Sequence, residues 1–155
     1  MGEPSQNRPI ELLLVEDNAA DVALTEEAFE ESSRSVTIVH MDNGADALSY
    51  LQKEAPHTDR KRPDIILLDL NLPRLDGWGV LDFVKSNPEL RTIPVVVLTT
   101  SIAPTDIARA YSLHANAYMA KPFDLQQFFD LIHNFESFWF DTVTLPTMSE
   151  SESGA

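Results

Sequence analysis

The chain contains no cysteine and carries little positive charge. Without cysteine it cannot form disulfides, use a thiolate nucleophile or hold zinc through sulfur. Lys and Arg number 11 against 25 Asp and Glu, which gives a formal net charge of −14. Nucleic-acid binding needs a basic patch that neutralises phosphates, and the basic cluster DRKR (59–62) reads as a solvated loop. We therefore expect no direct contact with nucleic acid.

Long hydrophobic runs are also missing from the sequence. No stretch is long enough to cross a membrane, and the N-terminal stretch MGEPSQNRPIE lacks the apolar segment of a signal peptide. The histidines are scattered and show no metal-ligand spacing. We therefore expect a cytoplasmic protein that makes no contact with a membrane.

The sequence does contain a regular alternation of short aliphatic runs and amphipathic segments, repeated five times. Its length suits one domain. Alternating strands and helices predict an α/β fold, with a doubly wound, five-stranded parallel sheet covered by helices on both faces. The predicted strands are 10–15, 35–40, 64–69, 94–99 and 117–120, and the predicted helices are 18–32, 44–53, 77–87, 104–113 and 124–139.

Polar residues gather where the predicted strands end. Glu16 and Asp17 follow the first strand, and Asp69 ends the third. Thr99 ends the fourth strand, and Lys121 follows the fifth. Taken singly, the acid pair is typical of a helix cap, and the lysine is typical of a solvated surface residue. In open parallel sheets, however, sites form at the carboxyl ends of the strands, so we expect these side chains to meet.

Three carboxylates in one crevice repel each other, and a divalent cation relieves that repulsion. Magnesium prefers oxygen ligands and suits two or three carboxylates together with a backbone carbonyl. The ammonium of Lys121 on the other side and the hydroxyl of Thr99 between them complete a cradle for a phosphoryl group. The residues therefore predict a Mg²⁺-dependent phosphoryl site.

Four motifs in this order resemble the receiver domain of two-component response regulators: VED (15–17), LLDLNLPRLDG (67–77), VVLTTS (96–101) and AYMAKPF (117–123). The resemblance covers residues 10–138 and implies a flavodoxin-like sheet with strand order 2-1-3-4-5. It implies that a histidine kinase transfers a phosphoryl group to Asp69. The domain would then be a phosphoacceptor that signals through protein contacts, with no enzymatic activity beyond self-catalysed phosphoryl transfer and autodephosphorylation.

The resemblance also implies a metal-binding role for four residues. Asp17 and Asp69 would ligate Mg²⁺ directly, and Glu16 would act mainly through water. Asn71 would provide its backbone carbonyl.

Further roles implied by the resemblance concern the phosphoryl group and the switch. Lys121 would pair with carboxylate or phosphoryl oxygens, placed by a cis bond to Pro122. Thr99 would donate its hydroxyl to the phosphoryl group. As Thr99 shifts, Tyr118 would turn inward and change the surface formed by the fourth helix, the fifth strand and the last helix.

The ends of the chain suggest a narrower resemblance. We expect a tail at 1–9, the receiver domain at 10–138 and an extension at 139–155 that is apolar and then disordered. The segment SFWFDTVTLP (137–146), with PVVVLTTS and the long loop 52–63, resembles small response regulators paired with cyanobacterial phytochromes and bacteriophytochromes. This resemblance implies a phytochrome-type histidine kinase as the partner.

Apolar residues spread over about half the circumference of the last predicted helix, which is more than one sheet face covers. We expect a homodimer through this helix and the extension, with an interface that includes Leu131, Phe138, Trp139 and Phe140. In the alternative, the extension folds back and covers the excess itself.

Two other classes of protein, a phosphatase and a cofactor binder, share part of this pattern. A haloacid-dehalogenase-type phosphatase needs a second Asp two residues after Asp69, where Asn71 stands. A flavodoxin-like cofactor binder needs a phosphate cradle that VEDNAAD (15–21) lacks. Within the receiver reading, a dimerisation switch, a phosphorelay intermediate and a phosphate sink all remain open.

Overall fold

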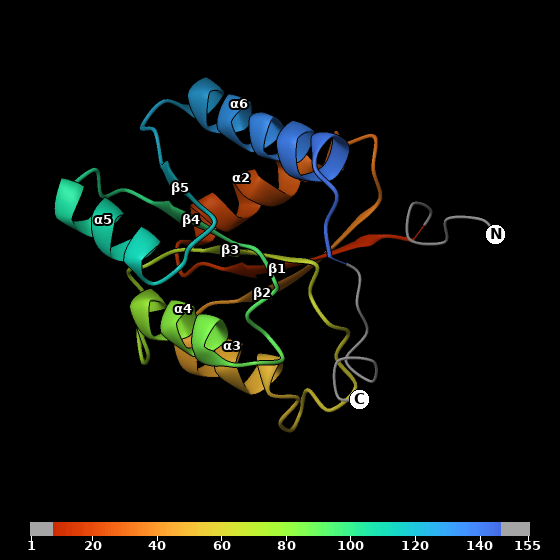
Figure 1. Ribbon diagram of the computed structural model, residues 1–155. Helices are drawn as coiled ribbons and strands as arrows, with labels where there is room; N and C mark the ends of the chain where they lie inside the picture. Colours follow the sequence, from red (N-terminus) through yellow and green to blue (C-terminus); the bar gives the residue numbers. More distant parts are fainter. Residues whose placement is uncertain (1–7, 147–155) are drawn as a thin grey trace.

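The computed structural model describes residues 8–146 and shows a central sheet between two layers of helices (Figure 1). The strands are β1 (Ile10–Val15), β2 (Val36–Met41), β3 (Ile65–Leu68), β4 (Val95–Thr99) and β5 (Ala117–Ala120). The helices are α2 (Ala19–Glu30), α3 (Gly44–Leu51), α4 (Gly77–Ser86), α5 (Pro104–Ser112), α6 (Leu125–Glu136) and the π-helix η1 (Ser137–Thr142). The disorder predicted for the end of the chain falls on 147–155, outside the described residues.

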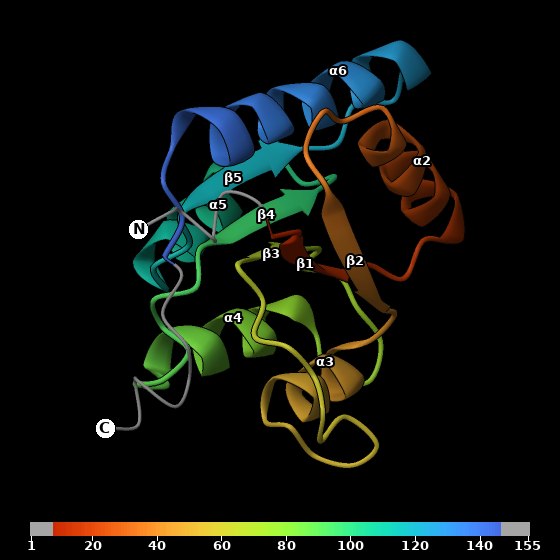
Figure 2. The same cartoon turned by 90° about the vertical axis from the view of Figure 1, so that its right-hand side faces the viewer.

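All four strand pairings are parallel, and the strand order is β2-β1-β3-β4-β5. This confirms the doubly wound fold and the predicted order. Helices α2 and α6 lie on one face of the sheet, and α3 and α4 lie on the other (Figure 2). The site expected at the carboxyl ends of the strands is therefore held between two helical layers.

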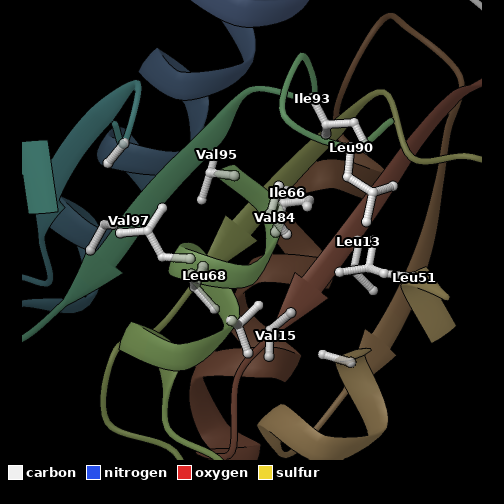
Figure 3. Packing of buried hydrophobic residues seen from close by; sticks show 14 of the residues in the cluster. Leu13, Val15, Leu51, Ile66, Leu68, Val84, Leu90, Ile93, Val95 and Val97 are labelled. Carbon is white, nitrogen blue, oxygen red and sulfur yellow. The ribbon is translucent and has the colours of Figure 1, made fainter. Parts of the chain in front are cut away.

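The unbroken aliphatic runs are explained by burial on both faces of the sheet. Successive side chains of a strand point to opposite faces, so Leu13 and Val15 pack toward α3 and α4 while Leu12 and Leu14 pack toward α2 and α6. Figure 3 shows the first of these two layers, in which side chains of β1, β3 and β4 meet those of α3 and α4. All four residues of β3 are buried.

Four of the helices begin at side-chain caps, whereas α5 begins at Pro104 without one. Asn18, Asn43, Asp76 and Asp124 each accept a hydrogen bond from a backbone N–H in the first turn of the helix that follows. These caps fix where the four helices start, directly after the loops that leave the strand ends.

The last helix differs from the prediction. Regular α-helix ends at Glu136, and η1 continues as a π-helix through residues 137–142. The predicted domain boundary at 138 therefore falls within η1.

The π-helix changes the expected surface. Phe140 is only 4% exposed; its ring centroid lies 5.9 Å from that of Phe29 and 5.7 Å from that of Phe135. Its assignment to a dimer interface was wrong, because the ring is part of the protomer's own core. Leu131 and Trp139 are partly buried against the same core cluster, whereas Phe138 is 51% exposed.

Candidate functional site

The strand ends bring the predicted site residues together at one edge of the sheet. The backbone N–H of Asp69 donates to the Val15 carbonyl at 2.9 Å, which sets Asp69 beside the acid pair that follows β1. The backbone N–H of Lys121 donates to the Thr99 carbonyl at 2.7 Å. The positions of all these residues are thus fixed by the ladder of the parallel sheet.

Three carboxylates form the acidic part of the site. Glu16, Asp17 and Asp69 each offer an oxygen, and these atoms lie within 4.8 Å of one another. Glu16 and Asp69 are buried, while Asp17 is exposed. Such a set of oxygen atoms, open on one side to water, fits the ligand preference of Mg²⁺.

Burial is the main influence on the charge of Glu16. Removal from water raises the pKa of Glu16 to about 7 and the charge of Asp69 raises it too, although the hydrogen bond from Lys121 lowers it. Crowded carboxylates that resist ionisation are stabilised when a cation binds them. The electrostatics of the cluster therefore favour cation binding.

The ammonium of Lys121 lies inside this cluster. Its Nζ is 2.7 Å from Glu16 Oε1, 2.9 Å from Asp21 Oδ2 and 3.0 Å from Asp69 Oδ2. Burial acts to lower the pKa of Lys121, but the hydrogen bonds to Glu16 and Asp21, with the charge of Asp69, raise it above its ordinary value. Lys121 is therefore a fixed cation at the site.

Asp21 was not among the predicted site residues. It lies in the first turn of α2, and the loop from β1 into that helix is short enough to bring its carboxylate back to the strand end. The sequence feature that could have indicated Asp21 is an acidic residue in the first turn of a helix that starts directly after a site strand.

The loop after Asp69 closes back on the site. Asp69 Oδ1 accepts a hydrogen bond from the Asn71 backbone N–H at 3.1 Å. At the far end of the loop, a Cβ added to Gly77 would lie 2.1 Å from the Asp69 carbonyl oxygen. Any larger residue at 77 would displace the backbone of Asp69, so glycine is required there.

Thr99 carries a buried hydroxyl that has no hydrogen-bond partner among the described residues. Leaving such a group unmet is costly, and native structures rarely do so without a reason. Since Thr99 ends β4 at the site edge, its hydroxyl is suited to donate to an anionic oxygen there. Nearby, the Tyr118 hydroxyl donates to the Ser101 carbonyl at 2.9 Å, which links β5 to the loop that follows Thr99.

The Lys121–Pro122 bond is trans, so the cis bond expected there was wrong; Ala55–Pro56 is cis. Three carboxylate contacts, rather than the peptide geometry, hold the Lys121 ammonium in place.

The basic cluster 59–62 is used within the fold. Arg60 donates to the carbonyls of Tyr50 and Leu51 at the end of α3, and Arg62 donates to the Glu89 carbonyl. Among the helices of residues 8–146, none is long and apolar enough to cross a membrane.

The five-stranded fold and the acidic site at its strand ends agree with one protein family. The family model "Response regulator receiver domain" matches residues 12–133, and the chain belongs to this family.

Two response regulators of this family, Rcp1 and RcpA, are similar to the chain over most of its length. The response regulator Rcp1 of Synechocystis sp. is 44% identical over 140 residues, covering 90% of this chain and 95% of Rcp1. The crystal structure of the phosphorylated cyanobacterial phytochrome response regulator RcpA has a TM-score of 0.88 and 45% identity, and that of the Mn²⁺-bound form of Rcp1 has a TM-score of 0.87 and 43% identity. Each match covers 90% of this chain and 100% of the solved one.

Proposed function

We propose that this protein is a phosphorylation-activated response regulator in which Asp69 accepts a phosphoryl group from a sensor histidine kinase. The observation that carries the proposal is the buried Asp69 carboxylate, which belongs to the acidic ligand set and lies 3.0 Å from the Lys121 ammonium. An Asp69 oxygen attacks phosphorus and forms the acyl phosphate. The P–N bond of phosphohistidine breaks, and its electron pair stays on the imidazole nitrogen, which takes up a proton from solvent.

In this proposal Glu16, Asp17 and Asp69 hold a divalent cation, with the Asn71 backbone carbonyl as a further ligand. Mg²⁺ bound there would neutralise charge on the phosphoryl group during transfer. The carboxylate oxygens within 4.8 Å of one another support this assignment, and the related Rcp1 has been crystallised in a Mn²⁺-bound form. Hydrolysis of the acyl phosphate at the same site would return the protein to its resting state.

We assign the phosphoryl oxygens to Lys121 and Thr99. The ammonium is already 3.0 Å from Asp69 Oδ2, and the Thr99 hydroxyl gains the partner that it lacks. As Thr99 moves toward the phosphoryl group, Tyr118 gives up its bond to the Ser101 carbonyl and turns inward. The surface made by α5, β5 and α6 then changes its preference for partners.

The proposed kinase is of the phytochrome type, because the similar regulator RcpA is a phytochrome response regulator. We place the reaction in the cytoplasm, where ATP supplies the kinase. The output we favour is a homodimer through α6 and η1, in which the exposed Phe138 is joined by Leu131 and Trp139. A phosphorelay intermediate or a phosphate sink would use the same site without such a dimer.

The test is the substitution Asp69→Asn, which keeps the shape of the side chain but removes the nucleophile. We expect labelling by a cognate kinase or by acetyl phosphate to fall to background, while circular dichroism and thermal unfolding show a folded protein. Asp76→Asn, at the cap of α4 beyond the site, is the control and should still be labelled. Undiminished labelling of the Asp69 variant would refute the proposal. Turnover of small phosphoesters would instead favour a phosphatase.

A further inference from the structure

The Lys121 ammonium has three N–H donors, and three carboxylates accept them. Two of the acceptors, Glu16 and Asp69, belong to the ligand set proposed for the cation. The third, Asp21, lies outside that set, with its Oδ2 at 2.9 Å from Nζ. The three acceptors are therefore of two kinds: two that a cation also uses and one that it does not.

Cation binding sets up a competition at Glu16 and Asp69. The cation draws on the same two carboxylates that Lys121 contacts at 2.7 and 3.0 Å, and it brings positive charge close to the ammonium. The side chain of Lys121 is only 6% exposed, so water cannot readily replace the lost partners. A buried ammonium left without a partner is strongly unfavourable. Some other carboxylate has to hold it.

Asp21 is placed for that purpose. Its backbone N–H donates to the Asn18 side chain at 3.0 Å, and its carbonyl accepts from the Thr25 hydroxyl at 2.7 Å. The first turn of α2 thus fixes its backbone independently of Lys121. The Asp21 side chain is 21% exposed, so one oxygen can hold the ammonium while the other remains hydrated.

We propose that Asp21 is the positioning residue that keeps Lys121 paired when a divalent cation takes oxygens of Glu16 and Asp69. It thereby reduces the competition between ammonium and cation and raises the affinity of the site for the cation. The inference rests on the proposed function only in that the cation binds this acidic cluster.

Asp21 also has an ordinary structural explanation. An acidic residue in the first turn of a helix is stabilised by the helix dipole whatever it contacts. It also adds a negative charge that attracts any cation nearby. A test of the proposal must therefore separate an effect through Lys121 from an effect of charge or helix stability alone.

The first measurement is the affinity of the full chain for Mg²⁺ by calorimetry, repeated with Mn²⁺ by electron paramagnetic resonance. We expect Asp21→Asn to weaken binding about tenfold, which corresponds to about 1.4 kcal/mol. The control Glu27→Gln removes the same charge from an exposed position on the same helix and should change the affinity less than about twofold. Equal affinities for the wild type and Asp21→Asn would overturn the inference and leave the proposed function standing.

The second measurement repeats Asp21→Asn in a Lys121→Met background. Lys121→Met alone should bind Mg²⁺ more tightly, because the competing ammonium is gone. In that background Asp21→Asn should have no larger effect than Glu27→Gln, since residues that act as a unit are non-additive. A tenfold loss that persists without Lys121 would show that Asp21 acts through its charge alone. Absence of any Mg²⁺ binding by the wild type would refute both proposals.

Discussion

At the scale of single residues, the site is governed by charges that are buried together. Removal of Glu16 from water is the largest influence on its pKa and raises it. The positive charge of Lys121 lowers the pKa of Glu16 and the negative charge of Asp69 raises it, and the net effect is a raised pKa. Because its pKa is raised to about 7, the proton on Glu16 competes with any metal that needs the same oxygens.

We expect Mg²⁺ affinity to rise with pH. Below a pKa of about 7, Glu16 is mostly protonated in the metal-free protein, and the cation has to displace that proton. Competition by one such proton predicts a gain of about tenfold between about pH 6 and about pH 8. The measurement is a calorimetric titration across this range.

Glu16→Gln is the matched control for this pH dependence. The variant cannot take up the proton, so its weaker affinity should change little over the same interval. Identical slopes for the two proteins would show that Glu16 does not titrate at the site.

The strand-end residues were predictable from sequence because an aliphatic run followed by a carboxylate marks both the strand and its end. Glu16 and Asp69 were found in this way. Asp21 was not, because it reaches the site from a helix and its own sequence context is that of an ordinary first-turn acid. The unmet hydroxyl of Thr99 also required coordinates, since a sequence does not say which hydroxyls lack partners.

At the scale of elements, one contact joins α4 and α5, two of the helices that follow the site strands. Helix α4 begins after the loop that leaves Asp69, and α5 begins after the loop that leaves Thr99. The guanidinium carbon of Arg109 on α5 lies 4.1 Å from the ring centroid of Trp78 on α4. A cation–π contact therefore ties the positions of α4 and α5 to each other.

We expect Arg109→Gln to lower the free energy of unfolding by about 0.5–1 kcal/mol, the range for an exposed cation–π pair. Urea unfolding followed by circular dichroism measures the loss. Arg91→Gln, a second exposed arginine, is the control and should stay within about 0.5 kcal/mol of the wild type. Equal stabilities of the Arg109 variant and the wild type would show that the contact contributes nothing.

Most elements were predicted to within one or two residues, because short unbroken aliphatic runs mark the buried strands and amphipathic segments mark the helices. The end of α6 was predicted wrongly. A π-helix closes on an i to i+5 bond, and five residues is the spacing of Phe135 and Phe140. In α-helical geometry these two rings would lie on different faces, so a continued α-helix would not bring Phe140 into the core beside Phe135.

At the scale of the whole molecule, the proposed dimer depends on the apolar side chains that α6 and η1 leave exposed. With Phe140 inside the core, Phe138 remains half-exposed in η1. Leu125 is also exposed, near the other end of α6. The dimer proposed through α6 and η1 therefore depends mainly on Phe138.

We expect Phe138→Asp to yield a monomer that is still phosphorylated on Asp69, because the change removes apolar contact area far from the site. Analytical ultracentrifugation at tens of micromolar, with and without phosphorylation, measures the state of assembly. Phe140→Asp is the contrasting variant: it places a charge in the core and should reduce thermal stability sharply. A monomeric wild type under both conditions would contradict the dimer.

The overall architecture was the most predictable level, since five alternations of strand and helix leave few topologies open. Assembly was the least predictable. It depends on which aromatic side chains the protomer buries in its own core. The π-helix η1 buries Phe140, which the sequence alone had assigned to the surface.

The buried hydroxyl of Thr99 lowers stability, although the proposed function requires it. A buried hydroxyl without a partner costs about 1–3 kcal/mol, and valine has nearly the same shape without that cost. A library screened for thermal stability alone would therefore enrich valine at 99 and lose the hydroxyl proposed to donate a hydrogen bond to the phosphoryl group. On the proposed function, threonine at 99 keeps a small instability in every resting molecule, and a phosphoryl group on Asp69 would relieve it by accepting a hydrogen bond from the hydroxyl.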